Sequence, residues 1–266
     1  MSGFAVRAHT LSRGVPGAPF VVFAHGMEGH WASWKLLAAH LDPDWRLVAL
    51  ELPWQAGKDY RWRARPVGDW LGDGLDLLGA IPEVLVAHSF GANAALELLC
   101  AHDPRPGRAA ALMCPFYRLP RYEVSWRMYD RSRETFVKHI GDGVRARLGK
   151  RAGGMDPEVL DGMVRVALDR AGPLGFAAVF DCYTASADLP LDQVQVPIRV
   201  LVGGEDPTLP PKVADALVDG MPGATLRVHE NFDHFFHVRQ AAAAAAEVSD
   251  LVAEVLATTT KVGELR

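Results

Sequence analysis

Short runs of apolar, often β-branched residues recur along the chain, and segments with helical periodicity separate them. Such runs are typical of parallel strands buried on both faces, because helices cover a parallel sheet from both sides. We interpret six runs as strands: residues 20–24, 46–50, 84–87, 109–113, 198–202 and 225–228. The patterns between them predict helices over residues 31–41, 68–78, 92–101, 212–219 and 239–257. The alternation predicts an α/β fold with a mostly parallel central sheet flanked by helices.

Length and composition narrow the class of protein. A chain of 266 residues fits one large α/β domain, or one such domain carrying an insertion. The hydrophobic fraction of 49% excludes a disordered chain, and the net charge of −4 gives no basic field that would favour nucleic acid. The three cysteines are too few and too widely spaced for a disulfide framework or a zinc site, so we expect reduced thiols and no metal. We recognise no signal peptide and no membrane span, and therefore expect a cytoplasmic protein.

One long segment interrupts the alternation of strands and helices. Residues 115–190 contain no convincing buried strand and show several helical patterns. We expect residues 1–114 and 191–266 to form the core of the fold. We expect residues 115–190 to form a helical lid over the carboxyl ends of the strands, where open α/β sheets bind ligands. An ordinary helical layer is the alternative.

The first half of this segment is basic and rich in aromatic residues. Between residues 118 and 151 there are ten Lys and Arg against four Asp and Glu. These cations could attract an acidic acyl carrier protein or its phosphate-bearing arm. The alternative, which we favour from the sequence, is a solvated helix face whose charge is balanced elsewhere. The aromatic candidates for substrate binding are Phe116, Tyr117, Trp126 and Tyr129.

Ser89 lies where the apolar run 84–87 passes into a helical pattern within a few residues. A serine on so tight a turn needs small residues two positions before and two after it, and these are Ala87 and Gly91. The turn would expose the hydroxyl beside the positive end of a helix, which favours a developing negative charge. Ser89 is therefore the predicted catalytic nucleophile.

A serine hydroxyl needs a base to accept its proton, and the base needs an acid to orient and stabilise it. Asp206 follows the predicted strand 198–202, and His234 follows the next one. Both therefore fall at the same edge of the sheet as Ser89. We predict a catalytic triad of Ser89, Asp206 and His234.

Other residues compete for these roles. Glu205 and Asp233 are alternative acids, and Asp206 could merely cap the turn before a proline. His237 is an alternative base, although its position favours the first turn of the last helix, facing elsewhere. His88 precedes the serine directly and is expected to pack beside the turn.

The loop after the first predicted buried strand offers a place for an oxyanion. Acyl transfer needs two amide N–H groups that face the oxyanion, one of them from the residue after the nucleophile. We therefore predict that the backbone amides of Phe90 and Met27 form the oxyanion hole. The alternative is that Gly26 simply permits a tight turn; His25 is expected to be structural.

Five motifs are spread over the chain: His25-Gly26, Glu51-Leu52-Pro53, Ala87-His88-Ser89-Phe90-Gly91, Gly203-Gly204-Glu205-Asp206-Pro207 and Asp233-His234. In these motifs the chain resembles the α/β-hydrolase superfamily over essentially its whole length. Within that superfamily the likeness is divided. Leu52-Pro53, Asp206-Pro207-Thr208 and His234-Phe235-Phe236 resemble type II thioesterases, whereas residues 26–34 resemble the general esterase and C–C hydrolase branch. Trp54 stands where relatives commonly have glycine, and we expect it to narrow or line the entrance of the pocket.

The resemblance implies a serine hydrolase that needs no cofactor and cleaves an ester or thioester through an acyl-enzyme. The aromatic residues of the expected lid favour a small-molecule substrate with a bulky apolar acyl group. The same fold with an intact serine turn also hosts acyl transfer, C–C cleavage, lyase and cyclisation reactions, and exclusion of water by the lid, rather than the triad, would separate these reactions from hydrolysis. A catalytically idle binding protein is a further alternative, because fold alone does not decide function.

Overall fold

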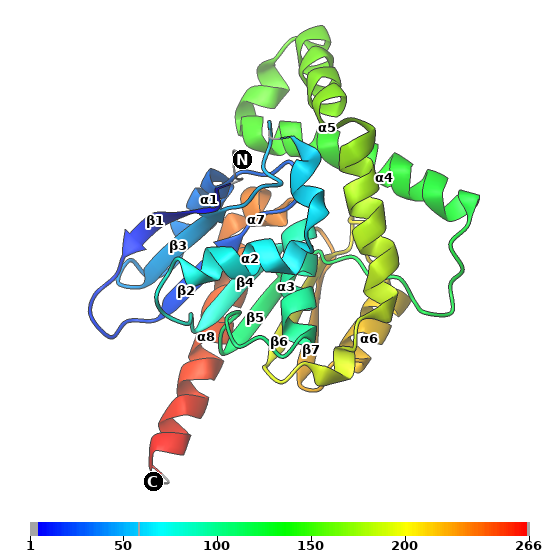
Figure 1. Cartoon of the computed structure of the whole chain (residues 1–266). Coiled ribbons are helices and arrows are strands. Elements are labelled where there is room, and N and C mark those ends of the chain that lie inside the picture. The colour runs from blue at the N-terminus through cyan, green and yellow to red at the C-terminus, as the bar shows by residue number, and fades with distance from the viewer. Residues whose placement is uncertain (1–4, 58, 265–266) are drawn as a thin grey trace.

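The structure is a computed structural model that describes residues 5–57 and 59–264. Its centre is a seven-stranded sheet in the order β1-β3-β2-β4-β5-β6-β7 (Figure 1). Every neighbouring pair is parallel except β1 with β3. The predicted mostly parallel α/β fold is therefore confirmed. The strands are β1 (Arg7–Arg13), β2 (Phe20–Ala24), β3 (Arg46–Glu51), β4 (Val84–His88), β5 (Ala109–Met113), β6 (Ile198–Gly203) and β7 (Ala224–His229).

The sheet has one strand more than the six expected, namely β1, which carries no apolar run. Its sequence, RAHTLSR, is mostly polar, and its residues are exposed or half-buried. An antiparallel edge strand needs no apolar run, since it is not covered on both faces. β1 pairs with β3 from Arg7 opposite Glu51 to Arg13 opposite Arg46, with one irregularity between Thr10 and Ser12.

Helices cover both faces of the sheet (Figure 1). Alternate strand residues point to opposite sides, so Val22 and Leu85 join one core while Val21 and Val86 join the other. The first core is closed by α2 (Val67–Asp76), α3 (Phe90–Cys100) and α6 (Pro211–Asp219). The second is closed by a short 3₁₀ turn (Trp31–Trp34), α1 (Lys35–Ala38), α7 (Phe236–Arg239) and α8 (Ala241–Glu264).

Residues 115–190 carry the two longest helical segments besides α8. They are α4 (Trp126–Leu148) and α5 (Pro157–Ala185), and they lie between β5 and β6 in the chain. α5 is kinked at Gly172-Pro173, where Gly172 has a φ of 55°. The two helices pack together through an apolar cluster of their own, which includes Phe136, Ile140 and Phe176. We refer to residues 115–190 as the helical insertion; its role as a lid stays a prediction.

The parallel arrangement fixes where the functional loops lie. β2, β4, β6 and β7 run in the same direction, so the loops after Ala24, His88, Gly203 and His229 all leave from one edge of the sheet. None of the helices in the described ranges is both long and apolar enough to cross a bilayer.

Candidate active site

Ser89 occupies a strained turn between β4 and α3. Its φ of 52° and ψ of −120° lie outside the regions that ordinary residues adopt, and its amide donates to the Met113 carbonyl at 2.8 Å. The glycine two positions later is required by space, because a Cβ at Gly91 would lie 2.5 Å from the His25 carbonyl oxygen. The hydroxyl is thus presented at the N-terminus of α3, on the sheet edge where the other loops arrive.

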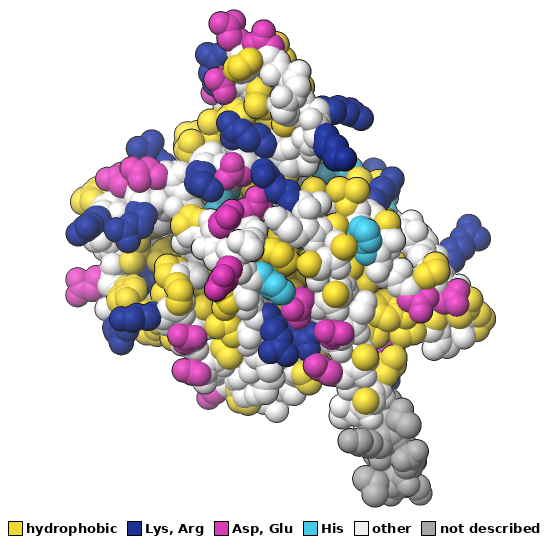
Figure 2. All heavy atoms as spheres, turned by 180° about the vertical axis from the view of Figure 1, so that it is seen from behind, with side chains coloured by type: hydrophobic (Ala, Val, Ile, Leu, Met, Phe, Trp, Pro, Cys, Tyr) yellow, Lys and Arg dark blue, Asp and Glu magenta, His cyan; other side chains and the backbone are white. Residues whose placement is uncertain are grey.

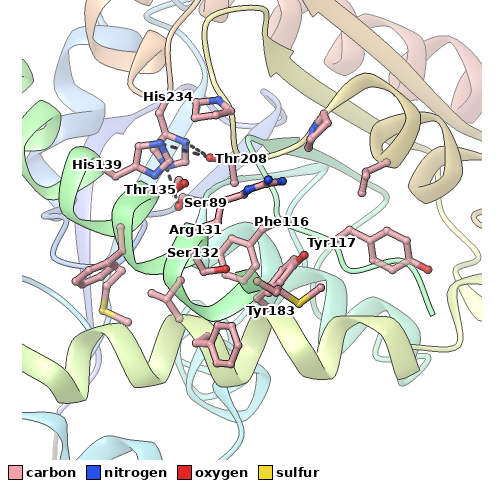
Figure 3. A pocket seen from close by; sticks show the side chains of 18 of the residues that line it. Ser89, Phe116, Tyr117, Arg131, Ser132, Thr135, His139, Tyr183, Thr208 and His234 are labelled. Carbon is pink, nitrogen blue, oxygen red and sulfur yellow. Dashed lines mark hydrogen bonds between the residues drawn. The ribbon is translucent and has the colours of Figure 1, made fainter. Parts of the chain in front are cut away.

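The three residues predicted to form a triad are connected by hydrogen bonds. Ser89 Oγ lies 3.0 Å from His234 Nε2, and His234 Nδ1 lies 2.7 Å from Asp206 Oδ2. The histidine and the aspartate are buried, whereas the serine is half-buried and borders a cavity (Figure 3). This geometry suits proton transfer from the hydroxyl to the imidazole while the carboxylate holds the imidazole in orientation.

The alternative acids do not contact His234. Glu205 is exposed to solvent. Asp233 accepts a hydrogen bond from the Phe235 amide at 2.8 Å and forms an ion pair with Arg239 at 3.1 Å. Asp206 is therefore the carboxylate that the fold directs toward the imidazole.

The neighbouring histidines, His88 and His237, pack beside the site and do not hydrogen-bond to the Ser89 hydroxyl in the described structure. His88 donates from Nε2 to the His234 carbonyl oxygen at 2.8 Å, and burial lowers its pKa well below the usual range, so it is neutral. His237 is buried in the first turn of α7 against His88 and Trp34. Burial also lowers the pKa of His237, to about 3.

Asp206 is held as a carboxylate although it is buried. Burial alone would raise its pKa, but the charge of His234 and the hydrogen bonds from His139 and His234 outweigh that effect and lower the pKa far below the usual range. Its Oδ1 also accepts hydrogen bonds from the amide and the hydroxyl of Thr208, at 3.0 and 2.5 Å. The acid is fully ionised at neutral pH and both of its oxygens have partners.

The loop after β2 brings the predicted second oxyanion donor to the serine. A Cβ at Gly26 would lie 3.0 Å from the Cβ of Ser89, so the loop approaches the turn closely. The Phe90 amide is at the first position of α3, where a helix offers no acceptor of its own. In the described part of the chain neither the Met27 nor the Phe90 amide has a protein acceptor. His25 is buried and accepts a hydrogen bond from the Leu52 amide at 3.1 Å, which fits the structural role expected for it.

A cavity of about 580 Å³ opens at Ser89 (Figure 3). The helical insertion supplies much of its wall, with Phe136 and His139 from α4 and Phe180 and Tyr183 from α5. Two of the aromatic residues predicted from the sequence, Phe116 and Tyr117, line this cavity.

The other three aromatic candidates need correction, because none of them lines the cavity. Trp54 is buried in the core, where its indole N–H donates to the His25 carbonyl at 2.8 Å, and it does not narrow the entrance. Trp126, at the first turn of α4, is 81% exposed. Tyr129 of α4 is half-buried and packs against Phe176 and Phe180 of α5.

Two residues at the site were missed as functional candidates. His139 of α4 stacks on His234, with ring centroids 3.9 Å apart and planes 11° from parallel, and its Nε2 lies 3.4 Å from Asp206 Oδ1. No sequence signal identifies His139. Helical periodicity predicts which face of the helix it occupies, but it does not predict which residue of another element that face contacts. Thr208 was noted only within a motif, although the short Asp-Pro-Thr spacing is typical of a hydroxyl that returns to the aspartate.

His139, Asp206 and His234 could together offer three ligand atoms to a metal ion, all within 4.8 Å of one another. The Thr208 hydroxyl already lies among them, 3.3 Å from His234 Nδ1 and 3.5 Å from His139 Nε2. The polar atoms therefore satisfy one another by hydrogen bonds, and we assign no metal role to the cluster.

Comparison with known proteins agrees with this architecture. A model of the alpha/beta hydrolase family matches residues 21–248. The chain belongs to the α/β-hydrolase family. It is an esterase-like hydrolase of that family, in line with the resemblance noted in its motifs.

Curated relatives and solved structures match most of the chain. A pimeloyl-[acyl-carrier protein] methyl ester esterase of Neisseria meningitidis serogroup B is 26% identical over 244 residues, covering 87% of this chain and 92% of the relative. The serogroup A protein of the same name is 26% identical over 248 residues, covering 89% and 77%. The enol-lactonase from Burkholderia xenovorans LB400 superposes with a TM-score of 0.64 at 20% identity, covering 93% and 96%. A haloalkane dehalogenase variant from Bradyrhizobium elkanii superposes with a TM-score of 0.64 at 17% identity, covering 97% and 99%.

Proposed function

We propose that the protein is a serine hydrolase that cleaves an ester or thioester with a bulky apolar acyl group. The hydrogen-bonded series Ser89–His234–Asp206, whose serine borders a cavity of about 580 Å³, is the observation that carries this proposal. In the first step Ser89 Oγ attacks the acyl carbonyl carbon while His234 Nε2 accepts the hydroxyl proton. Collapse of the tetrahedral intermediate breaks the bond to the leaving alcohol or thiol, which takes that proton from His234.

Water then completes the cycle. It attacks the acyl-enzyme carbonyl and gives a proton to His234, and the serine recovers this proton as the free acid leaves. Asp206 stays ionised throughout and stabilises the imidazolium that forms twice per turnover. The amides of Met27 and Phe90 stabilise the negative oxygen of both tetrahedral intermediates.

The lining of the cavity supports an apolar acyl group. Phe116, Phe136, Ile140, Val179 and Phe180 face the cavity and offer apolar surface to a chain extending from the serine. Burial of apolar surface contributes about 25 cal/mol per Å², so an acyl group lying against these side chains would gain affinity mainly by leaving water.

Within this reaction class we propose an acyl group attached to a carrier as the finer assignment. The curated relatives are named as esterases of a carrier-linked methyl ester. Arg127 and Arg131 of α4 line the cavity, and neither forms an ion pair or hydrogen bond with a described residue. Figure 3 shows Arg131 extending into the cavity. Two cations without partners at this place would suit the phosphate of a carrier arm or an acidic carrier surface.

Other cations of the helical insertion are already used within the fold. Lys138 and Arg145 both pair with Asp142, at 2.8 and 3.7 Å, and Arg147 donates to a backbone carbonyl. Figure 2 shows acidic side chains among the basic ones over the upper part of the molecule. The overall basic composition of the segment is thus weaker support for a carrier than the two arginines at the cavity.

The test compares substrates that share one ester but differ in what bears it. We expect the protein to hydrolyse p-nitrophenyl acyl esters with a rate that rises with acyl chain length, and to release free acid rather than a transferred acyl group. Ser89→Ala supplies the background, and hydrolysis no faster than this variant for every ester would overturn the proposal.

The carrier assignment has its own experiment. A methyl ester on an acyl carrier protein should have a lower KM than the same ester on free pantetheine, and the difference should shrink with salt. R127S/R131S should raise KM for the carrier-linked ester alone, whereas Arg133→Ser, on the same helix but outside the cavity, should not. If KM is the same for both substrates and does not change with salt, the proposal of a carrier-linked substrate is wrong.

A further inference from the structure

The helical insertion touches the predicted catalytic groups on both sides of Ser89, not only the cavity. On one side α4 places His139 against His234 and Asp206. On the other side α4 and α5 each place an arginine on Glu28, the residue after the predicted oxyanion donor Met27. A cover that merely shielded substrate from water would need neither contact.

We propose that the helical insertion positions the catalytic groups, through His139 on the acid–base pair and through Glu28 on the oxyanion loop. This inference rests on the proposed hydrolase function and assigns positioning roles within it. Without these contacts the Ser89 hydroxyl, the His234 imidazole and the two oxyanion amides would no longer be held in a fixed orientation relative to one another.

The contact of His139 fixes the plane of the imidazole. Its ring covers one face of His234 nearly in parallel, and its Nε2 is directed at the Asp206 oxygen that His234 does not use. Burial lowers the pKa of His139 to about 4, so the ring is neutral at neutral pH and does not repel the imidazolium that forms in turnover. Figure 3 shows the two rings side by side close to Ser89. His139 therefore restrains rotation of His234 away from the hydroxyl.

Glu28 is held at every polar group it has. Its amide donates to the Trp54 carbonyl at 2.9 Å, and its carboxylate accepts from the Tyr60 hydroxyl at 2.9 Å and from Arg170 Nε at 3.2 Å. Its carbonyl accepts from Arg147 at 3.1 Å. The side chain is buried and its φ is 52°, a conformation that few residues other than glycine keep without support.

The position of Glu28 links these contacts to catalysis. The Met27 N–H belongs to the peptide group between Gly26 and Met27, one residue before Glu28 in the loop that passes beside Ser89, so movement of Glu28 moves this N–H. Arg147 belongs to α4 and Arg170 to α5, close to the kink at Gly172. Both helices of the insertion therefore hold the loop in place.

The first test uses variants of His139 in the full-length protein. His139→Phe keeps the stacking and removes the contact with Asp206, His139→Gln keeps a donor and removes the stacking, and His139→Ala removes both. We expect His139→Ala to lower kcat and the rate of inactivation by a fluorophosphonate by about 10- to 100-fold with little change in KM, and the other two variants to restore part of the loss.

A matched histidine controls for general damage to the fold. His9 also stacks on an aromatic ring, that of Trp31 at 4.0 Å, and also contacts a carboxylate, that of Glu51 at 2.7 Å, but it lies on the edge strand β1. His9→Ala should leave both rates unchanged. Equal effects of His9→Ala and His139→Ala, or no effect of either, would overturn the role of His139.

The second test is a double-mutant cycle between Glu28 and Arg170. Glu28→Gln and Arg170→Met should each lower kcat more than they raise KM, because an oxyanion contact forms fully only in the transition state. If both act through one ion pair, the double variant should lose little more than either single one. Glu247→Gln is the control and should leave kcat unchanged, because it removes a carboxylate of α8 that pairs with Arg199 of β6 and His229 of β7.

The outcomes separate this inference from the proposed function. Wild-type hydrolysis with unchanged kcat in the His139 and Glu28 variants would overturn the positioning roles alone. Additive losses in the cycle would overturn the link between Glu28 and the insertion. Absence of wild-type hydrolysis and labelling would overturn the proposed function and the positioning roles together.

Discussion

Three side chains that are 28 to 145 positions apart in sequence form one hydrogen-bonded series at the edge of the sheet. Each follows a parallel strand, so its loop is delivered to the same edge whatever its distance along the chain. At the scale of the residue, His234 connects this series, because it contacts both the Ser89 hydroxyl and the Asp206 carboxylate.

We predict that His234→Ala lowers kcat by about 10⁴- to 10⁶-fold, since the hydroxyl then has no base, and that Asp206→Asn lowers it by about 10⁴-fold. Steady-state hydrolysis of a p-nitrophenyl ester measures both. His237 remains in place in His234→Ala and serves as an internal control. Near-normal turnover by this variant would show that the base had been misassigned.

The hydrogen-bonded series of Ser89, His234 and Asp206 could be predicted at this scale, whereas its surroundings could not; its catalytic role stays a prediction. Ser89, Asp206 and His234 have short-range signals: a strand, a tight turn and a polar residue at a fixed place. His139 has no such signal. The role proposed for it depends on its contact with His234, and only the packing of α4 creates that contact. Trp54 was misplaced for a related reason. Its indole N–H found a carbonyl acceptor inside the core, and sequence does not reveal that partner.

At the scale of the element, the docking of α3 on β2 decides whether the serine turn can form. The closest approach is at Gly91, where the helix backbone meets the carbonyl groups of Ala24 and His25. Any side chain there must push α3 away from the strand and carry Ser89 with it.

We predict that Gly91→Ala lowers the free energy of unfolding by roughly 1–3 kcal/mol and lowers kcat as well, because the new Cβ would lie 2.5 Å from a backbone oxygen that cannot move freely. Urea denaturation measures the first effect. Gly162→Ala is the matched control: it lies in α5 with open space around it, so alanine should leave stability unchanged or raise it by up to about 1 kcal/mol. Equal stability of the wild type and Gly91→Ala would contradict the packing argument.

The elements were predictable to the extent that burial produced a pattern. The six buried or partly covered parallel strands were found within a residue or two of their bounds, since apolar runs mark them. β1 was missed because an exposed edge strand carries no such run. The last helix was expected over residues 239–257, but the chain first forms the short α7 and then α8, which extends to Glu264.

At the scale of the whole molecule, the fold buries several histidines in their neutral form. Burial lowers the pKa of His25 and His139 to about 4 and that of His237 to about 3, and it lowers the pKa of His88 well below the usual range. In the unfolded chain each would have a pKa near 6.5. Between about pH 6.5 and 4 the unfolded chain therefore binds protons that the folded chain does not.

We predict that stability falls as the pH is lowered through this window. Above about pH 6.5 these imidazoles are neutral in both states and exert no pH dependence. Below it each can cost up to about 1.4 kcal/mol of unfolding free energy per pH unit until the folded protein also binds the proton. The carboxylate of Asp206 acts at lower pH, because its stabilising contribution is lost only as the pH falls below its unfolded pKa of about 3.9.

Urea denaturation at pH 7 and pH 5 measures this dependence. The free energy of unfolding should be lower at pH 5 by several kcal/mol. An equal free energy of unfolding at pH 7 and pH 5 would mean that these histidines take up protons equally well in the folded and unfolded chain. That result would contradict the prediction that they are neutral in the folded protein.

The central claim is that the fold presents Ser89 as the nucleophile and that His234 activates it. Mass spectrometry of the intact protein and of its peptides after reaction with a fluorophosphonate tests this claim most directly. We expect one adduct per chain, on Ser89, formed rapidly by the wild type and much more slowly by His234→Ala. No adduct on the wild type, or an adduct on a residue other than Ser89, would contradict it.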